Sequence, residues 1–149
     1  MDLILWRHAD AADGEVDLAR ELTLRGHKQA ERMARWLSKR LPGDARIVSS
    51  PAQRARETAT ALAPNFQVDD RVAPGAWPSD VLAACGWPEG GSVVVVGHQP
   101  TLGRIVSQLL TGESRDWSFR QGAIVWLRSR EREGDAQVVL RAALTPELI

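Results

Sequence analysis

Cysteine is almost absent from this chain of 149 residues, in which Cys85 is the only thiol. An intrachain disulfide is therefore impossible, and the composition gives no sign of an oxidising compartment. A cysteine-dependent phosphatase would need an arginine six positions after its nucleophile, where this chain has Gly91. No cysteine or histidine pair has the spacing of zinc ligands. The sequence thus excludes disulfide-stabilised folds, cysteine-dependent phosphatases and structural zinc sites.

The chain also lacks an excess of charge of either sign, because 19 Lys and Arg residues balance 19 Asp and Glu residues. A neutral molecule has no overall attraction for nucleic acid or for anionic membranes, so we expect neither as a partner. Long apolar runs are missing as well. The first one, Leu3–Trp6, is shorter than the core of a signal peptide or a membrane helix. We therefore expect a cytoplasmic protein that does not span a membrane.

What the composition contains is typical of a globular domain, with 44% hydrophobic and 26% charged residues. A chain of this length is about one domain and can bury a core of its own. No internal repeat and no break in composition divides it. We predict a single domain over residues 1–149.

Three helices are predicted from apolar residues that recur every three or four positions. Thr23 can cap the first helix, whose apolar face extends to Leu41. Pro51 and Pro100 suit the first turns of the second and third helices, and Gly112 suits the end of the third. Each of these helices follows a short apolar run.

The apolar runs predict the strands of a sheet. Leu3–Trp6 and Val93–Val96 are uninterrupted, which is typical of parallel strands buried on both faces, and a shorter run stands at Ile47–Val48. Residues 122–128 and 136–143 predict a terminal pair of strands. The alternation of strands and helices predicts an α/β fold: a three-layer α/β/α sandwich with a mostly parallel central sheet and a C-terminal strand pair.

Polar side chains follow two of the predicted strands. Arg7 and His8 come directly after the first, and His98 follows the run at Val93–Val96. Ligands of open α/β sheets gather at the carboxyl ends of the strands. If the two strands are neighbours, both imidazoles and the guanidinium share a pocket. If they are not, each histidine is an ordinary packed residue.

Arg54 lies one turn into the helix that follows the second strand, where free N–H groups and the helix dipole favour an anion. Its planar guanidinium matches the oxygens of a phosphate, whereas Arg56 is expected to face solvent. A neutral imidazole can attack phosphorus, and nearby cations keep it unprotonated and offset the charge of the transferring group. These residue types favour a phosphorylated substrate.

Three strings in this order resemble the histidine phosphatase superfamily, whose fold is that of phosphoglycerate mutases. They are Arg7-His8-Ala9, Ser50-Pro51-x-x-Arg54-Ala55-x-x-Thr58 and Gly97-His98. Within the superfamily, residues 7–11, 20–23 and 96–100 are similar to those of the SixA-type phosphohistidine phosphatases.

The resemblance implies a phosphatase in which His8 accepts the phosphoryl group as a covalent phosphohistidine, which water then hydrolyses. It implies that Arg7, Arg54 and His98 bind the phosphoryl oxygens, and that Arg20 approaches the pocket. It implies no cofactor and no metal ion. On residue types alone, His8, Asp10 and His98 could ligate a metal, but the neighbouring arginines would repel the cation.

The chain departs from the superfamily pattern at Ala9, where glycine is usual; alanine is tolerated there only if its φ is negative. It also lacks an acidic residue over residues 71–79, where many superfamily members that act on phosphate monoesters carry their proton donor. An alkoxide needs a proton to leave, whereas imidazole leaves a protonated phosphoramidate without one. The departure favours a protein that carries phosphohistidine as the substrate.

Two rival functions remain open from the sequence. A small-molecule phosphomonoesterase would use Asp10, Glu57 or Asp80 as the proton donor, although Asp80 reads equally as a surface carboxylate and Glu57 as a residue that orients Arg54. A phosphate-binding module without catalysis would keep the same anion-binding residues. The imidazole of His27 is expected to face solvent with no role.

Six tryptophans are an unusual number for this length. Three fall in predicted regular elements and are expected in or near the core: Trp6, Trp36 and Trp126. The other three fall in predicted loops, where we expect packing rather than a substrate rim: Trp77, Trp87 and Trp117.

Overall fold

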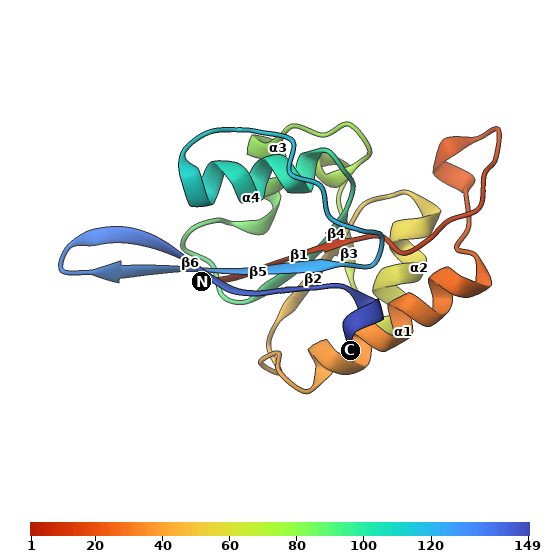
Figure 1. Cartoon of the computed structure of the whole chain (residues 1–149), viewed down its shortest axis with the longest axis horizontal. Helices are drawn as coiled ribbons and strands as arrows, with labels where there is room; N and C mark the ends of the chain where they lie inside the picture. The colour runs from red at the N-terminus through yellow and green to blue at the C-terminus, as the bar shows by residue number, and fades with distance from the viewer.

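A six-stranded sheet runs through the middle of the computed structural model, which describes all residues 1–149 (Figure 1). The strands lie in the order β3-β2-β4-β1-β5-β6, and β1 to β4 are parallel whereas β5 and β6 run antiparallel. Their bounds are β1 Asp2–Arg7, β2 Arg46–Ser49, β3 Gln67–Val68, β4 Val93–Gly97, β5 Ile124–Arg132 and β6 Asp135–Leu144.

Helices cover both faces of this sheet. The α-helices are α1 Leu24–Ser38, α2 Gln53–Leu62, α3 Pro78–Cys85 and α4 Thr101–Thr111, and the short 3-10 helices are η1 Asp17–Ala19, η2 Asp70–Val72 and η3 Pro146–Leu148. One apolar core lies between the sheet and α1 with α2, and a second lies between the sheet and α3 with α4. The predicted sandwich is confirmed, including the C-terminal strand pair. None of the helices is long and apolar enough to cross a bilayer.

The side chains of β1 alternate between the two cores. Ile4 and Trp6 face α1 and α2, whereas Leu3 and Leu5 face α3 and α4, and all four are fully buried. β4 lies directly beside β1, in parallel, with Arg7 opposite Gly97. The two predicted strands are therefore neighbours, and the residues that follow them leave the sheet at the same edge.

The ends of the helices differ in part from the prediction. Thr23 caps α1 as expected, because its side chain accepts a hydrogen bond from the Gly26 N–H, but the helix ends at Ser38 rather than Leu41. Leu41 packs beside the core from the following turn, so its contribution to the apolar pattern is real although it is not helical.

The two prolines stand just outside the helices for which they were predicted. Pro51 precedes α2 by two positions, because the Ser50 hydroxyl accepts the Ala52 N–H and forms a turn before the first helical residue. Pro100 occupies the position directly before α4. Gly112 ends α4 in the left-handed conformation, as predicted.

The tryptophans of regular elements, Trp6, Trp36 and Trp126, are buried or partly buried as expected. Of those in loops, Trp87 packs against the core under α3 and α4. The expectation of packing is wrong for Trp77, which is 71% exposed, and for Trp117, which is 43% exposed. Trp77 stands directly before α3, and Trp117 lies in the segment between α4 and β5.

Gly26 allows the first turn of α1 to approach the segment after β1. A Cβ at this position would collide with the backbone carbonyl of Asp10, which cannot move as freely as a side chain. We expect Gly26→Ala to lower the free energy of unfolding by about 1–3 kcal/mol, measured by chemical denaturation. Gly43→Ala is the matched control, because nothing lies within 4 Å of its added Cβ. Equal stability of the two variants would contradict this account.

Candidate active site

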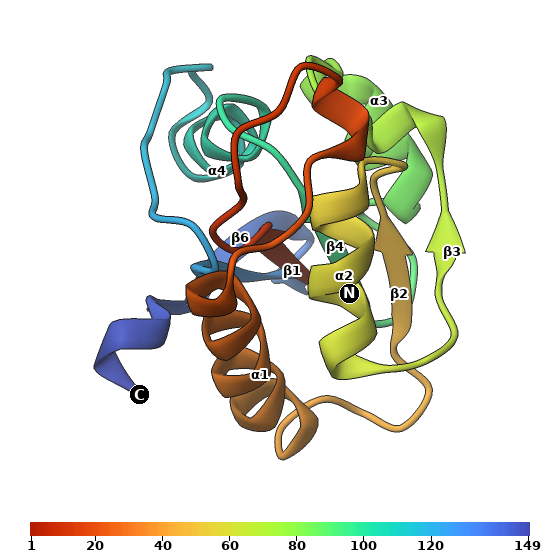
Figure 2. The same cartoon turned by 90° about the vertical axis from the view of Figure 1, so that its right-hand side faces the viewer.

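The pairing of β1 with β4 brings His8 and His98 together at the carboxyl edge of the sheet. Their ring centroids lie 5.2 Å apart, with the planes tilted by 52°. Both residues are buried, with exposures of 8% and 5%. Figure 2 faces this edge and shows η1 beside the first turn of α2.

Arg54, from the first turn of α2, lies between the two histidines. Its Nε donates a hydrogen bond to His8 Nε2 at 3.3 Å, and one terminal nitrogen lies 3.5 Å from His98 Nδ1. The residue is only 4% exposed. The sequence-predicted residues His8, Arg54 and His98 therefore form one cluster, whereas Arg56 is exposed as expected.

Arg7 lies at the end of β1, beside this cluster. One of its terminal nitrogens donates to the Phe119 carbonyl at 2.8 Å, which orients the guanidinium. Its Nε is buried and donates to no group of the protein. A buried donor without a partner is costly, so an anion at this position would gain a hydrogen bond that the protein itself does not use.

A hydrogen bond selects the tautomer of His8, and a second holds the ring of His98. His8 Nδ1 lies 2.8 Å from the Ala9 carbonyl, which can only accept, so Nδ1 carries the proton and Nε2 presents a lone pair. His98 Nε2 lies 2.7 Å from the Ser50 hydroxyl. Ser50 belongs to the motif that resembles the superfamily, but no pattern in the sequence predicts its contact with His98, because only the folded sheet places the two residues together.

Both imidazoles are neutral near neutral pH. Burial, reinforced by the charges of Arg54 and Arg7, lowers the pKa of His8 from 6.5 to about 4 despite the opposing Ala9 hydrogen bond. Burial also lowers the pKa of His98 to about 3, with His8 and Arg54 adding to the effect. Sequence reasoning named the cations as the cause, but loss of solvent is the larger one.

Asp17 was missed by the sequence analysis. Its carbonyl accepts from one terminal nitrogen of Arg54 at 2.8 Å, and its carboxylate accepts from the other at 3.2 Å. The same carboxylate pairs with Arg20 at 3.2 Å, so Arg20 reaches the edge of the cluster through Asp17. No spacing distinguishes Asp17 from Asp13 and Glu15 in the same loop, so no sequence signal could have selected it.

Ala9 fits its position without strain. The only non-glycine residue with a positive φ is Glu133, so the methyl group of Ala9 is tolerated. Its N–H donates to the Thr58 hydroxyl at 3.1 Å, and that hydroxyl donates to the Arg54 carbonyl at 2.7 Å. Thr58 thus joins α2 to the turn that carries His8.

The candidate proton donors, Asp10, Glu57 and Asp80, either accept hydrogen bonds from the chain around α1 or lie on the protein surface. Asp10 accepts the hydroxyl of Thr23 at 2.6 Å. Glu57 accepts the backbone N–H of Leu22 at 3.0 Å and lies 3.7 Å from His27, which is solvent-facing as expected. The hypothesis that Glu57 orients Arg54 is wrong, since its carboxylate holds the loop before α1.

Asp80 is exposed on the first turn of α3, as a surface carboxylate. No group of three or more histidine, cysteine or acidic residues is arranged to hold a metal ion, so His8, Asp10 and His98 do not form such a set.

The edge of the sheet thus holds a buried, neutral imidazole whose Nε2 lone pair accepts a hydrogen bond from a guanidinium group, an arrangement typical of phosphatases that use a histidine. The sequence matches the histidine phosphatase superfamily (branch 1) over residues 3–76. It is 32% identical over 124 residues to the phosphohistidine phosphatase SixA of Escherichia coli K12, covering 76% of this chain and 77% of that protein. The chain belongs to the histidine phosphatase superfamily and is a histidine-phosphatase-type enzyme similar to SixA.

Further relatives agree with this assignment. The solved structure of the protein histidine phosphatase SixA complexed with tungstate superposes with a TM-score of 0.83, at 27% identity, over 99% of each chain. An uncharacterised protein of Picosynechococcus is 33% identical over 144 residues, covering 87% of this chain and 86% of its own. The similarity extends over nearly the whole fold.

The lowered histidine pKa values predict how stability depends on pH. Between pH 6.5 and about 4, His8 and His98 are protonated in the unfolded chain but remain neutral in the folded protein. The free energy of unfolding should therefore be retained above pH 6.5 and fall as the pH drops, by about 1.4 kcal/mol per pH unit for each histidine. Chemical denaturation across this range measures the slope.

Two variants isolate the contribution of the cluster. His98→Asn should flatten the slope by one histidine's share, and His8→Asn should flatten it in the same way. A slope in His98→Asn as steep as in the parent protein would refute the assignment.

Asp17 offers a second test, on anion binding. Asp17→Asn keeps an acceptor for Arg54 but removes the negative charge that competes with an anion. We expect tungstate to bind roughly three- to tenfold more tightly, as measured by isothermal titration calorimetry. Asp13→Asn, in the same loop without a contact to Arg54, should leave the affinity unchanged. Unaltered or weaker binding to Asp17→Asn would be incompatible with competition at Arg54.

Proposed function

We propose that this protein hydrolyses phosphohistidine on a partner protein, through a covalent phosphohistidine intermediate on His8. The observation that carries the proposal is the arrangement of His8, whose Nδ1 is held by Ala9 and whose unprotonated Nε2 lies 3.3 Å from Arg54 Nε. A buried nucleophile beside a fixed cation suits attack on a phosphoryl group.

In the first step, a phosphoryl oxygen takes over the hydrogen bond from Arg54 Nε, the freed lone pair of His8 Nε2 attacks phosphorus, and the P–N bond of the substrate breaks so that its imidazole leaves neutral. Arg7, Arg54 and His98 bind the phosphoryl oxygens and offset their charge. The new bond makes the His8 ring cationic, and its Nδ1–H then donates a stronger, charge-assisted hydrogen bond to the Ala9 carbonyl.

In the second step, water attacks phosphorus, the bond to His8 Nε2 breaks, and inorganic phosphate leaves with the oxygen of water. The ring returns to its neutral form. The chemistry needs only side chains of this chain, so we propose a reaction without a metal ion. Arg20 contributes through its pairing with Asp17 rather than by direct contact with His8.

The acidic residues around the site support the choice of substrate. Asp10 and Glu57 are hydrogen bonded to the chain around α1, and the hydrogen bond from Arg20 holds the pKa of Asp17 below its ordinary value. Asp17 is therefore ionised near neutral pH and cannot supply a proton. A leaving group that needs no added proton, such as imidazole, fits this site better than an alkoxide.

A rapid-quench experiment tests the intermediate. Wild-type protein is mixed with a protein carrying radiolabelled phosphohistidine and quenched in alkaline detergent, in which phosphohistidine survives. We expect transient label on the wild-type enzyme, and neither label nor release of phosphate above background with His8→Ala. His27→Ala is the matched control and should retain both.

The same assay separates the rival functions. Phosphate release without label on His8 would refute the covalent step, and binding without turnover would identify a phosphate-binding module instead. Turnover of sugar phosphates as fast as that of the phosphohistidine protein would overturn the proposed substrate class.

A further inference from the structure

A stripe of cations runs along the exposed flank of α1. Its members recur at alternating intervals of three and four residues, which places them on one side of the helix and of the residue that caps its C-terminus, Lys39: Arg25, Lys28, Arg32, Arg35 and Lys39. All five are exposed. At 1.5 Å per residue the stripe is about 21 Å long. This concentration stands out because the whole chain has no net charge.

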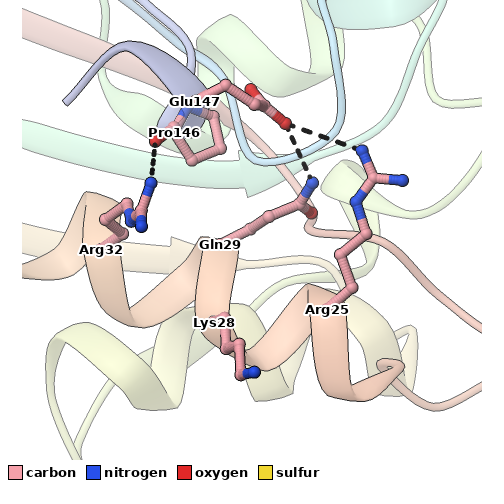
Figure 3. A pocket seen from close by; sticks show the side chains of 6 residues that line it. All are labelled: Arg25, Lys28, Gln29, Arg32, Pro146 and Glu147. Carbon is pink, nitrogen blue, oxygen red and sulfur yellow. Dashed lines mark hydrogen bonds and ion pairs between the residues drawn. The ribbon is translucent and has the colours of Figure 1, made fainter.

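The cationic stripe is poorly neutralised by the protein itself. Its one carboxylate contact joins Arg25 to Glu147 at 3.9 Å (Figure 3). Elsewhere, seven arginines have a carboxylate within 3.4 Å: Arg20, Arg54, Arg71, Arg104, Arg115, Arg128 and Arg141. The stripe therefore offers charge that internal ion pairs do not use.

The surface along the stripe is hollowed. A cavity of about 200 Å³ lies between α1 and η3, lined by Arg25, Lys28 and Arg32 together with Gln29, Pro146 and Glu147 (Figure 3). A second hollow, of about 350 Å³, continues from Arg32 past Arg35 to Lys39. Acidic side chains of a partner could enter both hollows from one direction.

The stripe begins beside the candidate active site. Thr23, directly before α1, binds the carboxylate of Asp10, which is two positions after His8. The buried Gln29 accepts the backbone N–H of Asp10 at 2.9 Å and donates to Glu147 at 3.2 Å. A partner lying along the stripe would thus have one end at the edge of the sheet where His8 stands.

The other occupants of a basic surface fit this helix less well. The apolar face of α1 is buried against the sheet, and the partly buried ring of Trp36 is covered by Arg40 at 4.2 Å. Leu24 is the one large apolar side chain of the helix that is exposed, so a bilayer would find a single apolar anchor rather than an apolar face. Nucleic acid would meet a molecule without net positive charge. An acidic helix, with carboxylates every three or four residues, matches both the length and the repeat of the stripe.

We propose that Arg25, Lys28, Arg32, Arg35 and Lys39 form a docking surface for an acidic helical segment of the phosphohistidine-bearing protein. This inference rests on the proposed function for the identity of the partner. The surface steers the partner by charge and holds it outside the His8 pocket, so it affects binding of a protein substrate and not the chemical step.

The test uses a binding measurement that does not depend on activity. The probe is a fluorescent, unphosphorylated helical peptide with five glutamates at the intervals of the stripe. The variant Lys28→Glu/Arg35→Glu/Lys39→Glu changes only side chains without hydrogen bonds to the rest of the protein. We expect its affinity for the peptide, measured by anisotropy at low salt, to be at least about tenfold weaker than that of the wild type.

Two controls accompany this measurement. Arg130→Glu/Arg132→Glu also replaces cations by carboxylates, but on the β5–β6 hairpin, and its affinity for the peptide should stay within about twofold of that of the wild type. Lys28→Gln/Arg35→Gln/Lys39→Gln should give an intermediate loss, which separates charge from misfolding; circular dichroism checks that each variant is folded. Equal peptide binding by the wild type and the glutamate variant would overturn the proposal, as would stronger binding of duplex DNA or phosphatidylglycerol vesicles than of the peptide.

A kinetic arm links the surface to the reaction. With an acidic phosphohistidine protein, the glutamate variant should show a KM raised at least about tenfold and an unchanged kcat, whereas turnover of free phosphohistidine should be unaffected. An unchanged KM for the protein would refute docking on this surface. If the wild type turns over neither substrate, the proposed function fails, while the peptide measurement still decides whether the acidic docking surface exists.

Discussion

The parallel pairing of β1 with β4 is the constraint on which the rest of the structure depends. It places Arg7 opposite Gly97, so the residues that follow, His8 and His98, leave the sheet side by side. A slip of one position would turn every side chain of a strand to the opposite face. The strands are fully buried between two apolar cores, so such a slip would expose apolar groups and is strongly disfavoured. Apolar packing thereby sets the geometry of a polar site.

Burial at this edge has two effects that act together. It lowers the pKa of the imidazoles, so that His8 is unprotonated, and it strengthens the field of the guanidinium groups by excluding water. The same burial makes uncompensated positive charge costly. Asp17 offsets part of that cost at Arg54 in the free protein, and a phosphoryl group would take over this task when substrate binds.

Helix α1 connects the core, the site and the outer surface through different sides of one element. Its apolar side, which includes Met33 and Leu37, packs on the sheet, and its first turn holds the segment after His8 through Thr23 and Gln29. Its third side is the cationic stripe. Because one rigid helix carries all three, a partner bound to the stripe would have a defined position relative to the nucleophile.

The amino-acid sequence by itself predicted the order of α1, α2, α4 and every strand except the two-residue β3, and it singled out His8, Arg7, Arg54 and His98, because apolar periodicity and short motifs are local properties of the chain. It also determined that Ala9 and the absence of an acid over residues 71–79 set this chain apart within its superfamily.

Only the tertiary structure decided which strands are neighbours, where the carboxylates of Asp17 and Glu57 point, and that Ser50 contacts His98. These features depend on contacts between segments far apart in the chain and on side-chain rotamers, which no local pattern encodes. For the same reason, the sequence predicts Leu41 and Pro51 inside helices, whereas α1 ends before Leu41 and α2 begins after Pro51. In each case a turn replaces the helix at little cost in apolar burial: the Leu37 carbonyl accepts the Leu41 N–H, and the Ser50 hydroxyl accepts the Ala52 N–H.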